Sequence, residues 1–181
     1  MSNLQFSNTF FVKKLTLLSV LAIFLLPYSV SAEIKGFQDF TGKTQLFENH
    51  IGKGKWLVVM MWASDCHICN REAHQYVDFH MIHSDTDATV LGISLDGESR
   101  KKEALGFISK HSVDFPNLIA EPSTVAALYQ NATGQGFVGT PTFLIYSPEG
   151  ELKAAQAGAV PTELIEDFMK KNSANKVVKN N

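Results

Sequence analysis

The sequence predicts an α/β fold in which a mixed central sheet is flanked by helices. Two apolar runs, "KWLVVMMW" at residues 55–62 and "ATVLGISL" at residues 88–95, are too continuous in their hydrophobicity for half-exposed strands, and they predict buried ones. Helical patterns follow both runs, and two further strands and a closing helix come after them. This order predicts a mixed sheet with helices on both of its faces.

The other elements can be placed in order along the chain. Residues 36–47 predict a short hairpin that turns at 41–43, where a glycine lies between two polar residues. A helix is expected from Cys66 to His83. Further helical patterns occupy "SRKKEALGFISKH" at residues 99–111 and "PSTVAALYQ" at residues 122–130.

The last part of the chain predicts a second hairpin and a final helix. Residues 139–158 contain two strands separated by a Pro-Glu-Gly turn, and residues 161–172 open with proline and threonine and continue as an amphipathic helix. We interpret "ESRKKE" at residues 98–103 as a solvated helix start. His80 and His83 are interpreted as solvated helix residues.

The N-terminus predicts a secretory signal peptide over residues 1–32. Two lysines precede an apolar run at residues 15–26, and the small residues Val30 and Ala32 follow it. A positive flank, an apolar run of about a dozen residues and small residues before the cleavage position are the parts of such a signal. A membrane anchor would need about 20 apolar residues, so this alternative is less favoured. We expect a periplasmic or otherwise exported protein, cleaved near Ala32.

The remaining chain predicts one domain at residues 33–172 and a polar tail at residues 173–181. The whole sequence carries a formal net charge of −2 and has no cluster of basic residues. Such a composition argues against nucleic acid and anionic membrane surfaces as partners. We expect a monomer that needs no cofactor.

The only two cysteines, Cys66 and Cys69, lie within "MWASDCHICNRE" at residues 61–72, directly after a predicted buried strand. As a structural staple the pair would be weak, because so small a loop contributes only about 2 kcal/mol. A zinc site needs four ligands, and no histidine on the following helix is well placed beside both sulfurs. A site completed by His50 or His111 stays an alternative.

A redox couple fits the position of the two cysteines better. Cys66 is expected where a strand ends and a helix begins, and the free N–H groups and helix dipole at that point favour an anionic sulfur. Cys69 lies one turn further and is expected to be more buried. The sequence therefore predicts Cys66 as the nucleophile and Cys69 as the resolving cysteine.

The sequence resembles the thioredoxin superfamily, and within it the exported TlpA/ResA-like thiol–disulfide oxidoreductases. The matching features are "WASDCHIC" at residues 62–69, Glu72 and "GTPTFLIYSPEG" at residues 139–150. The resemblance covers about residues 36–172, and the N-terminal hairpin and a central insertion around residues 99–118 resemble additions typical of this branch. It implies a thioredoxin-like fold with both additions.

The same resemblance implies a function. Such a protein reduces disulfides of other exported proteins, receives electrons from a membrane donor and has cytochrome c maturation as one candidate pathway. It also implies that Pro141 is cis, that the Thr140 backbone pairs with an extended substrate, and that Trp62 packs beside the site. For Trp62 a purely structural place in the core is the alternative. Other functions left open are a disulfide oxidase or isomerase, a protein that handles Cu(I) or another soft metal, and a redox-inert binding module.

Several positions depart from the family pattern. Asp65 and Ile68 replace residues that are often tryptophan and proline, and Met60 replaces the buried acid that assists proton transfer from the resolving cysteine. Glu72 is a candidate for that task, with an ordinary helix-surface position as its alternative. Asp65 is expected to oppose a thiolate at Cys66, whereas a protonated His67 would favour it. The three residues Asp65, His67 and Glu72 are therefore predicted to tune the redox pair.

Overall fold

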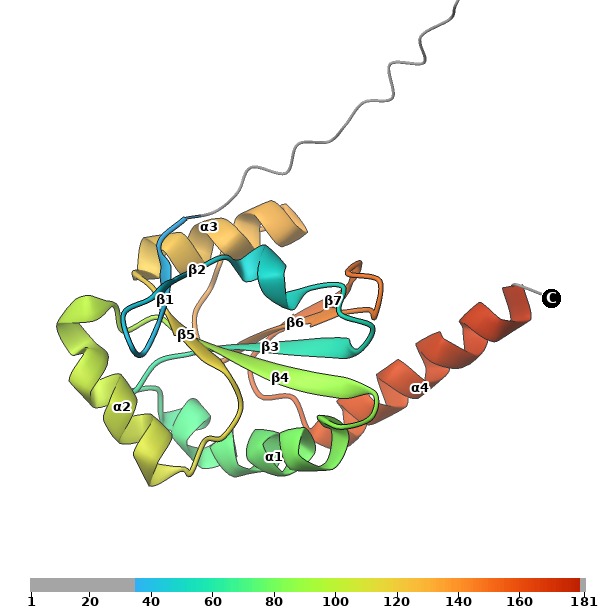
Figure 1. The fold of residues 1–181 in the computed structure, drawn as a ribbon, viewed down its shortest axis with the longest axis horizontal. Helices are drawn as coiled ribbons and strands as arrows, with labels where there is room; N and C mark the ends of the chain where they lie inside the picture. The colour runs from blue at the N-terminus through green and yellow to red at the C-terminus, as the bar shows by residue number, and fades with distance from the viewer. Residues whose placement is uncertain (1–34, 180–181) are drawn as a thin grey trace, which may run out of the picture. The chain divides into compact units, whose positions relative to one another are not determined.

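The computed structural model describes residues 35–179, with side chains up to residue 174, so the predicted signal peptide lies outside the described residues. Within this range the strands form one mixed sheet in the order β2-β1-β5-β4-β3-β6-β7 (Figure 1). The strands are β1 (Phe37–Asp39), β2 (Thr44–Gln45), β3 (Trp56–Trp62), β4 (Ala88–Ser94), β5 (Asn117–Ile119), β6 (Thr142–Tyr146) and β7 (Leu152–Ala157). β3, β4 and β5 are parallel, and the remaining pairs are antiparallel. This confirms the predicted thioredoxin-like α/β class.

The two apolar runs form the centre of the sheet. Every residue of β3 is buried, and β4 is buried at all but one position, as expected for parallel strands covered on both faces. β3 lies between β4 and β6, and its register places Trp62 opposite Ser94 and Met60 opposite Phe143. The carboxyl ends of β3 and β4 therefore meet at one edge of the sheet.

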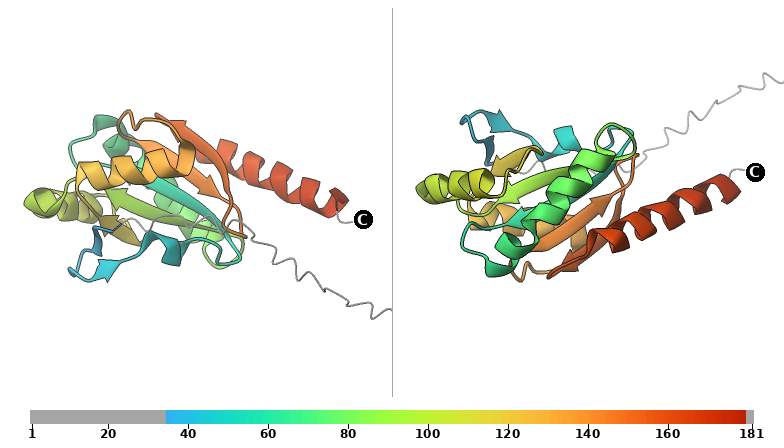
Figure 2. Two further views of the ribbon diagram at one scale, coloured as in Figure 1. Left: turned by 90° about the horizontal axis from the view of Figure 1, so that it is seen from above. Right: turned by 90° about the horizontal axis from the view of Figure 1, so that it is seen from below.

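Helices cover both faces, as predicted (Figure 2). They are α1 (His67–His83), α2 (Lys101–Lys110), α3 (Pro122–Thr133) and α4 (Thr162–Lys179), with short 3-10 turns η1 (Phe47–His50) and η2 (Glu98–Arg100). Apolar side chains of α1, α2 and α4 pack in one core cluster with one face of the sheet. Those of α3 and η1 pack in a second cluster with the other face.

Local sequence explains where several elements start and stop. α3 begins with Pro122 at its first turn and ends before Gly134, which adopts a left-handed φ of 73°. In the N-terminal hairpin, the Asp39 carboxylate accepts hydrogen bonds from Thr41, Lys43 and Gln45. These bonds, led by the one from the Thr41 hydroxyl, lower the pKa of Asp39 to about 2 and fix the predicted turn.

Four details differ from the sequence-based expectations. β5 and η1 were not predicted, and α4 continues to Lys179, beyond the end of the helix predicted for residues 161–172. His80 is not simply solvated, because its Nδ1 accepts a hydrogen bond of 3.1 Å from the Val90 amide.

Among residues 35–179, no helix has the length and apolar content needed to cross a membrane.

Candidate active site

Cys66 and Cys69 lie at the start of α1, at the edge where β3 and β4 end. The structure joins their sulfurs in a disulfide, with the two Cα atoms 5.2 Å apart. Cys66 is the N-cap residue of α1, and its Sγ accepts a hydrogen bond of 3.0 Å from the Cys69 amide. The amides of a helix start thus face the Cys66 sulfur, which is the environment that stabilises a thiolate after reduction.

The two sulfurs differ in exposure. Cys66 is partly buried, whereas Cys69 is 0% exposed and belongs to the same core cluster as Met60 and Trp62. This is the asymmetry that the sequence predicted. Of the two sulfur-bearing side chains, only that of Cys66 is accessible from the surface in this disulfide-bonded state.

Met60 occupies the core beside this pair, at 1% exposure. Its position therefore provides no proton acceptor, as the sequence indicated. Glu72, the suggested substitute, accepts hydrogen bonds of 2.8 Å from Arg71 and 2.6 Å from Gln75. The Glu72 carboxylate, whose side chain is 23% exposed, is thus held by its neighbours on α1.

Trp62 is 1% exposed, stacks on Phe107 at 4.2 Å between ring centroids, and donates a hydrogen bond of 3.0 Å to Asn117. The structure thus buries Trp62 in the core cluster that also contains Cys69. His67 is exposed on the first turn of α1.

Thr140 and Pro141 lie in the loop that enters β6. The peptide bond between them is cis, as the resemblance implied. Pro141 is buried and Thr140 is partly exposed. The Thr142 hydroxyl donates a hydrogen bond of 2.5 Å to the Gly139 carbonyl, which closes this loop on itself.

A network that the sequence analysis missed surrounds the loop before Cys66. Asp96, whose side chain is 0% exposed, accepts hydrogen bonds from the Ser64 amide (2.9 Å) and the Ser64 hydroxyl (2.7 Å). Arg100 donates a hydrogen bond of 2.7 Å to Asp65 and another of 3.2 Å to the Ser64 hydroxyl. The hydrogen bond from Arg100 holds the pKa of Asp65 below its usual value.

Two expectations are changed by this network. Asp65 was expected to act on Cys66 as an uncompensated charge, but its carboxylate is paired with Arg100. Arg100 was interpreted as part of a solvated helix start, yet it contacts the active-site loop. One available signal pointed to Asp96: it follows the carboxyl end of a buried strand, and polar groups at this edge of a parallel sheet commonly form sites.

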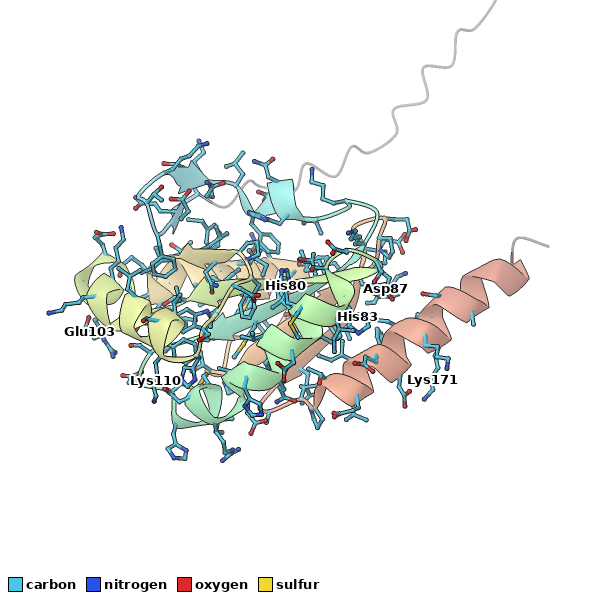
Figure 3. The ribbon with its side chains drawn as sticks, turned by 60° about the horizontal axis from the view of Figure 1, so that its bottom comes forward. His80, His83, Asp87, Glu103, Lys110 and Lys171 are labelled. Atoms are coloured by element: carbon cyan, nitrogen blue, oxygen red, sulfur yellow. A yellow bond between two sulfur atoms is a disulfide. The ribbon has the colours of Figure 1, made fainter. Side chains whose placement is uncertain are left out.

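A second connection joins the other side of the loop to the end of α2. Asn70 donates hydrogen bonds to the carbonyls of Ser64 (2.9 Å) and Cys66 (3.0 Å). The side-chain oxygen of Asn70, Oδ1, lies 3.1 Å from Lys110 Nζ and 3.0 Å from His111 Nε2. Burial first, and then the neighbouring Lys110, lower the pKa of His111. Figure 3 shows Glu103 and Lys110 on α2, beside α1, with Lys171 on α4 at the other side.

Within residues 35–179, no group of three or more His, Cys, Asp and Glu side chains is arranged to hold a metal ion. His50 and His111, the distant candidates from the sequence, form no such group with the cysteines.

Comparisons with known proteins agree with this fold. The model of the AhpC/TSA family matches residues 31–155. The thioredoxin domain of a thiol–disulfide oxidoreductase from Bacteroides vulgatus is similar in structure, with a TM-score of 0.61, 22% identity and coverage of 78% of this chain and 96% of its own. A thiol:disulfide interchange protein from Chlorobium tepidum gives a TM-score of 0.62 and 19% identity, covering 77% and 92%. No curated protein sequence matches this chain.

A third similar structure is a secreted disulfide oxidoreductase from Mycobacterium tuberculosis, with a TM-score of 0.57, 20% identity and coverage of 74% of this chain and 92% of its own. At these identities the three structures establish the fold. Fold and site together define a thioredoxin-superfamily protein with a cysteine pair at the start of its first long helix. The chain belongs to the AhpC/TSA family and, with this pair, is a thiol–disulfide oxidoreductase.

Proposed function

We propose that this protein reduces disulfides of other exported proteins through the Cys66–Cys69 pair. The observation that carries the proposal is the unequal exposure of two sulfurs that lie within bonding distance of each other at a helix start. The TlpA/ResA-like branch is part of this proposal, because the hairpin and the segment containing α2 occur where that branch has its additions.

The reaction takes place in two steps. The Cys66 thiolate attacks one sulfur of the client disulfide, forms a mixed disulfide and releases the other client sulfur as a thiolate. The Cys69 thiolate then attacks Cys66 Sγ, forms the intramolecular disulfide and releases the second client sulfur. The client gains two electrons and the pair loses two. The resulting oxidised pair is the state seen in the structure.

Export and an electron donor complete the proposal. The pattern at residues 1–32 supports export, and two similar structures are described as a secreted oxidoreductase and a pneumococcal exposed lipoprotein thioredoxin. Exported compartments are oxidising, so a reductase there needs a dithiol donor at the membrane to return two electrons to the pair. Cytochrome c maturation is one candidate pathway for such a protein.

Client binding is assigned to the loop before β6. Thr140 is partly exposed beside buried Pro141, and Val138, two residues before Thr140, is 79% exposed. We propose that an extended client segment pairs with the Thr140 backbone while its disulfide meets Cys66. An extended segment binds a free backbone edge without requiring one particular sequence.

The direction of electron flow is tested by the reduction potential of the pair, measured by equilibration with glutathione. A potential near or below about −270 mV supports the reductase, whereas one near −120 mV supports a disulfide oxidase. Stoichiometric metal on the purified protein together with no insulin reduction would instead favour the soft-metal function.

The roles of the sulfurs are tested by trapping. Cys69→Ala should accumulate mixed disulfides through Cys66, because the first step proceeds and the second cannot. Cys66→Ala is the matched control and should trap none, since Cys69 is 0% exposed. Non-reducing electrophoresis of an exported fraction shows the adducts and identifies clients. Equal trapping by the two variants would refute the assigned roles.

A further inference from the structure

Arg100 reaches from the start of α2 to the two residues that precede Cys66. Its Nη1 donates to Asp65 Oδ2 at 2.7 Å and its Nη2 donates to the Ser64 hydroxyl at 3.2 Å. Its Nε lies 3.6 Å from Asp96 Oδ1. One guanidinium group therefore contacts three side chains, and two of them lie immediately before the reactive cysteine.

Asp96 holds these contacts in a fixed position. Its buried carboxylate accepts hydrogen bonds from the Ser64 amide and hydroxyl and from the Ser94 hydroxyl, the last at 2.8 Å. A buried carboxylate is stable only where such partners are present, so the group is held in one place at the end of β4. Ser64 and Arg100 are both positioned against it.

Charge gives Arg100 a second effect. The Asp65 carboxylate is next to Cys66 in the chain and opposes a negative sulfur. Arg100 offsets that charge at a distance well within the Debye length of about 10 Å at 0.1 M salt. The other charged or titratable groups near the loop are Asp96 and Glu103, which act on Arg100, the exposed His67 in the first turn of α1, and Lys110 and His111, which contact Asn70. Of all these groups, only Arg100 contacts Asp65 in the described structure.

We propose that Arg100 is a positioning residue for the redox pair: it holds Ser64 and Asp65 in place and offsets the Asp65 charge, so that Cys66 forms its thiolate near neutral pH. This inference rests on the proposed function only in taking Cys66 as the attacking sulfur. It assigns to the start of α2 a role in reactivity beyond that of a solvated helix end.

The test measures Cys66 alone, in whole chains that carry Cys69→Ser. The rate of alkylation by iodoacetamide is followed from pH 5 to 10, because only the thiolate reacts. Arg100→Gln should lower the rate at pH 7 by about three- to fivefold and move the midpoint of the profile to higher pH. The alkylation rate of Arg100→Lys should lie between the rates with Arg100 and with Arg100→Gln, since lysine keeps the charge but lacks the planar guanidinium group.

Lys101→Gln is the matched control. It removes the same charge from the adjacent residue, whose ion pair is with Glu98 at 3.5 Å. It should change the rate by less than about 1.5-fold, because the Lys101 charge is paired with Glu98 and not with the loop before Cys66. Equal effects of Arg100→Gln and Lys101→Gln would overturn the proposal.

The double variant tests whether Arg100 acts on Cys66 by offsetting the Asp65 charge. Adding Asp65→Asn to Arg100→Gln should restore most of the lost rate, because the uncompensated carboxylate is gone. A loss that Asp65→Asn does not restore would overturn the proposal, since Arg100 would then act through folding alone. If Arg100→Gln does not fold by circular dichroism, Asp65→Asn by itself decides: with the Asp65 charge gone and Arg100 still present, the rate must rise, and an unchanged rate overturns the proposal.

This measurement is independent of the proposed function. Alkylation needs no client and no electron donor. A protein that shows the Arg100 dependence but fails to reduce insulin would refute the reductase proposal and leave this inference standing.

Discussion

The two ends of α1 carry similar groups in different settings. At its start, Asp65 and the buried Asp96 meet Arg100 around the loop before Cys66. At its end, His83 lies 2.8 Å from Asp87 and 3.4 Å from Glu166 of α4 (Figure 3). The first cluster is anchored by a carboxylate of 0% exposure, whereas Asp87 and Glu166 are 59% and 46% exposed. The Arg100–Asp65 pair is itself 42% and 63% exposed, so the two clusters differ in the buried Asp96 and in their distance along α1 from the cysteines.

The largest expected effect is on activity at the start of the helix. Cys66→Ser should reduce insulin-disulfide reduction by at least about 100-fold, because a serine hydroxyl stays protonated and forms no mixed disulfide. His83→Ala, at the other end of α1, should retain activity within about twofold. Turbidity of insulin with dithiothreitol as the electron source measures both. If Cys66→Ser kept more than about a tenth of the unsubstituted protein's activity, the expected difference between the two ends of α1 would be absent.

The second effect is on stability. Asp96→Ala should lower the free energy of unfolding by about 2–3 kcal/mol, because it leaves the buried Ser94 hydroxyl and the partly buried Ser64 amide and hydroxyl without their acceptor. Asp87→Ala removes an exposed carboxylate and should cost about 0.5 kcal/mol. Urea denaturation at pH 7 compares the two variants. Equal losses would mean that burial does not distinguish the two clusters.

The third effect depends on pH and concerns His80, near the end of α1. Burial lowers the pKa of His80, and its neutral Nδ1 accepts the Val90 amide. A lowered histidine pKa favours folding fully above about pH 6.5 and loses that contribution as pH falls from 6.5 through the folded value. The loss should stay below about 1 kcal/mol, because solvent screens this partly exposed ring.

Urea denaturation between pH 7.5 and 4.5 measures this dependence. His80→Gln should reduce the loss of unfolding free energy below pH 6.5. It should not abolish that loss, since burial also lowers the pKa values of His50 and His111. An unchanged curve would show that His80 does not contribute.

The smallest effect is expected at the ion pairs of His83. His83→Gln should cost about 0.3–0.5 kcal/mol at low salt and less in 1 M salt, since the facing carboxylates are largely solvated. Denaturation at two salt concentrations tests it. A loss above about 1.5 kcal/mol that salt does not reduce would mean that this end of α1 is as strongly held as its start.

Much of the fold was accessible from the sequence because its central signals are local. Continuous apolar runs predicted β3 and β4, and the N-terminal turn, the β6–β7 hairpin and α4 were marked by their own residues. β5 was not, because a strand of three residues has too little pattern of its own. It exists through its neighbours: the Gly92 amide donates to the Pro116 carbonyl, and the Ala120 amide donates to the Ser94 carbonyl.

The active site, like the fold, was predictable from the sequence only in its local features. The sequence by itself determined that two cysteines stand one turn apart where a buried strand passes into a helix, and this local order sets the exposed and buried sulfurs. Only the tertiary structure decided which charges meet them. Asp65 and Arg100 are 35 positions apart, and they meet because β3 and β4 end side by side and α2 starts at that edge. Electrostatic interactions depend on distance through space, and folding sets that distance.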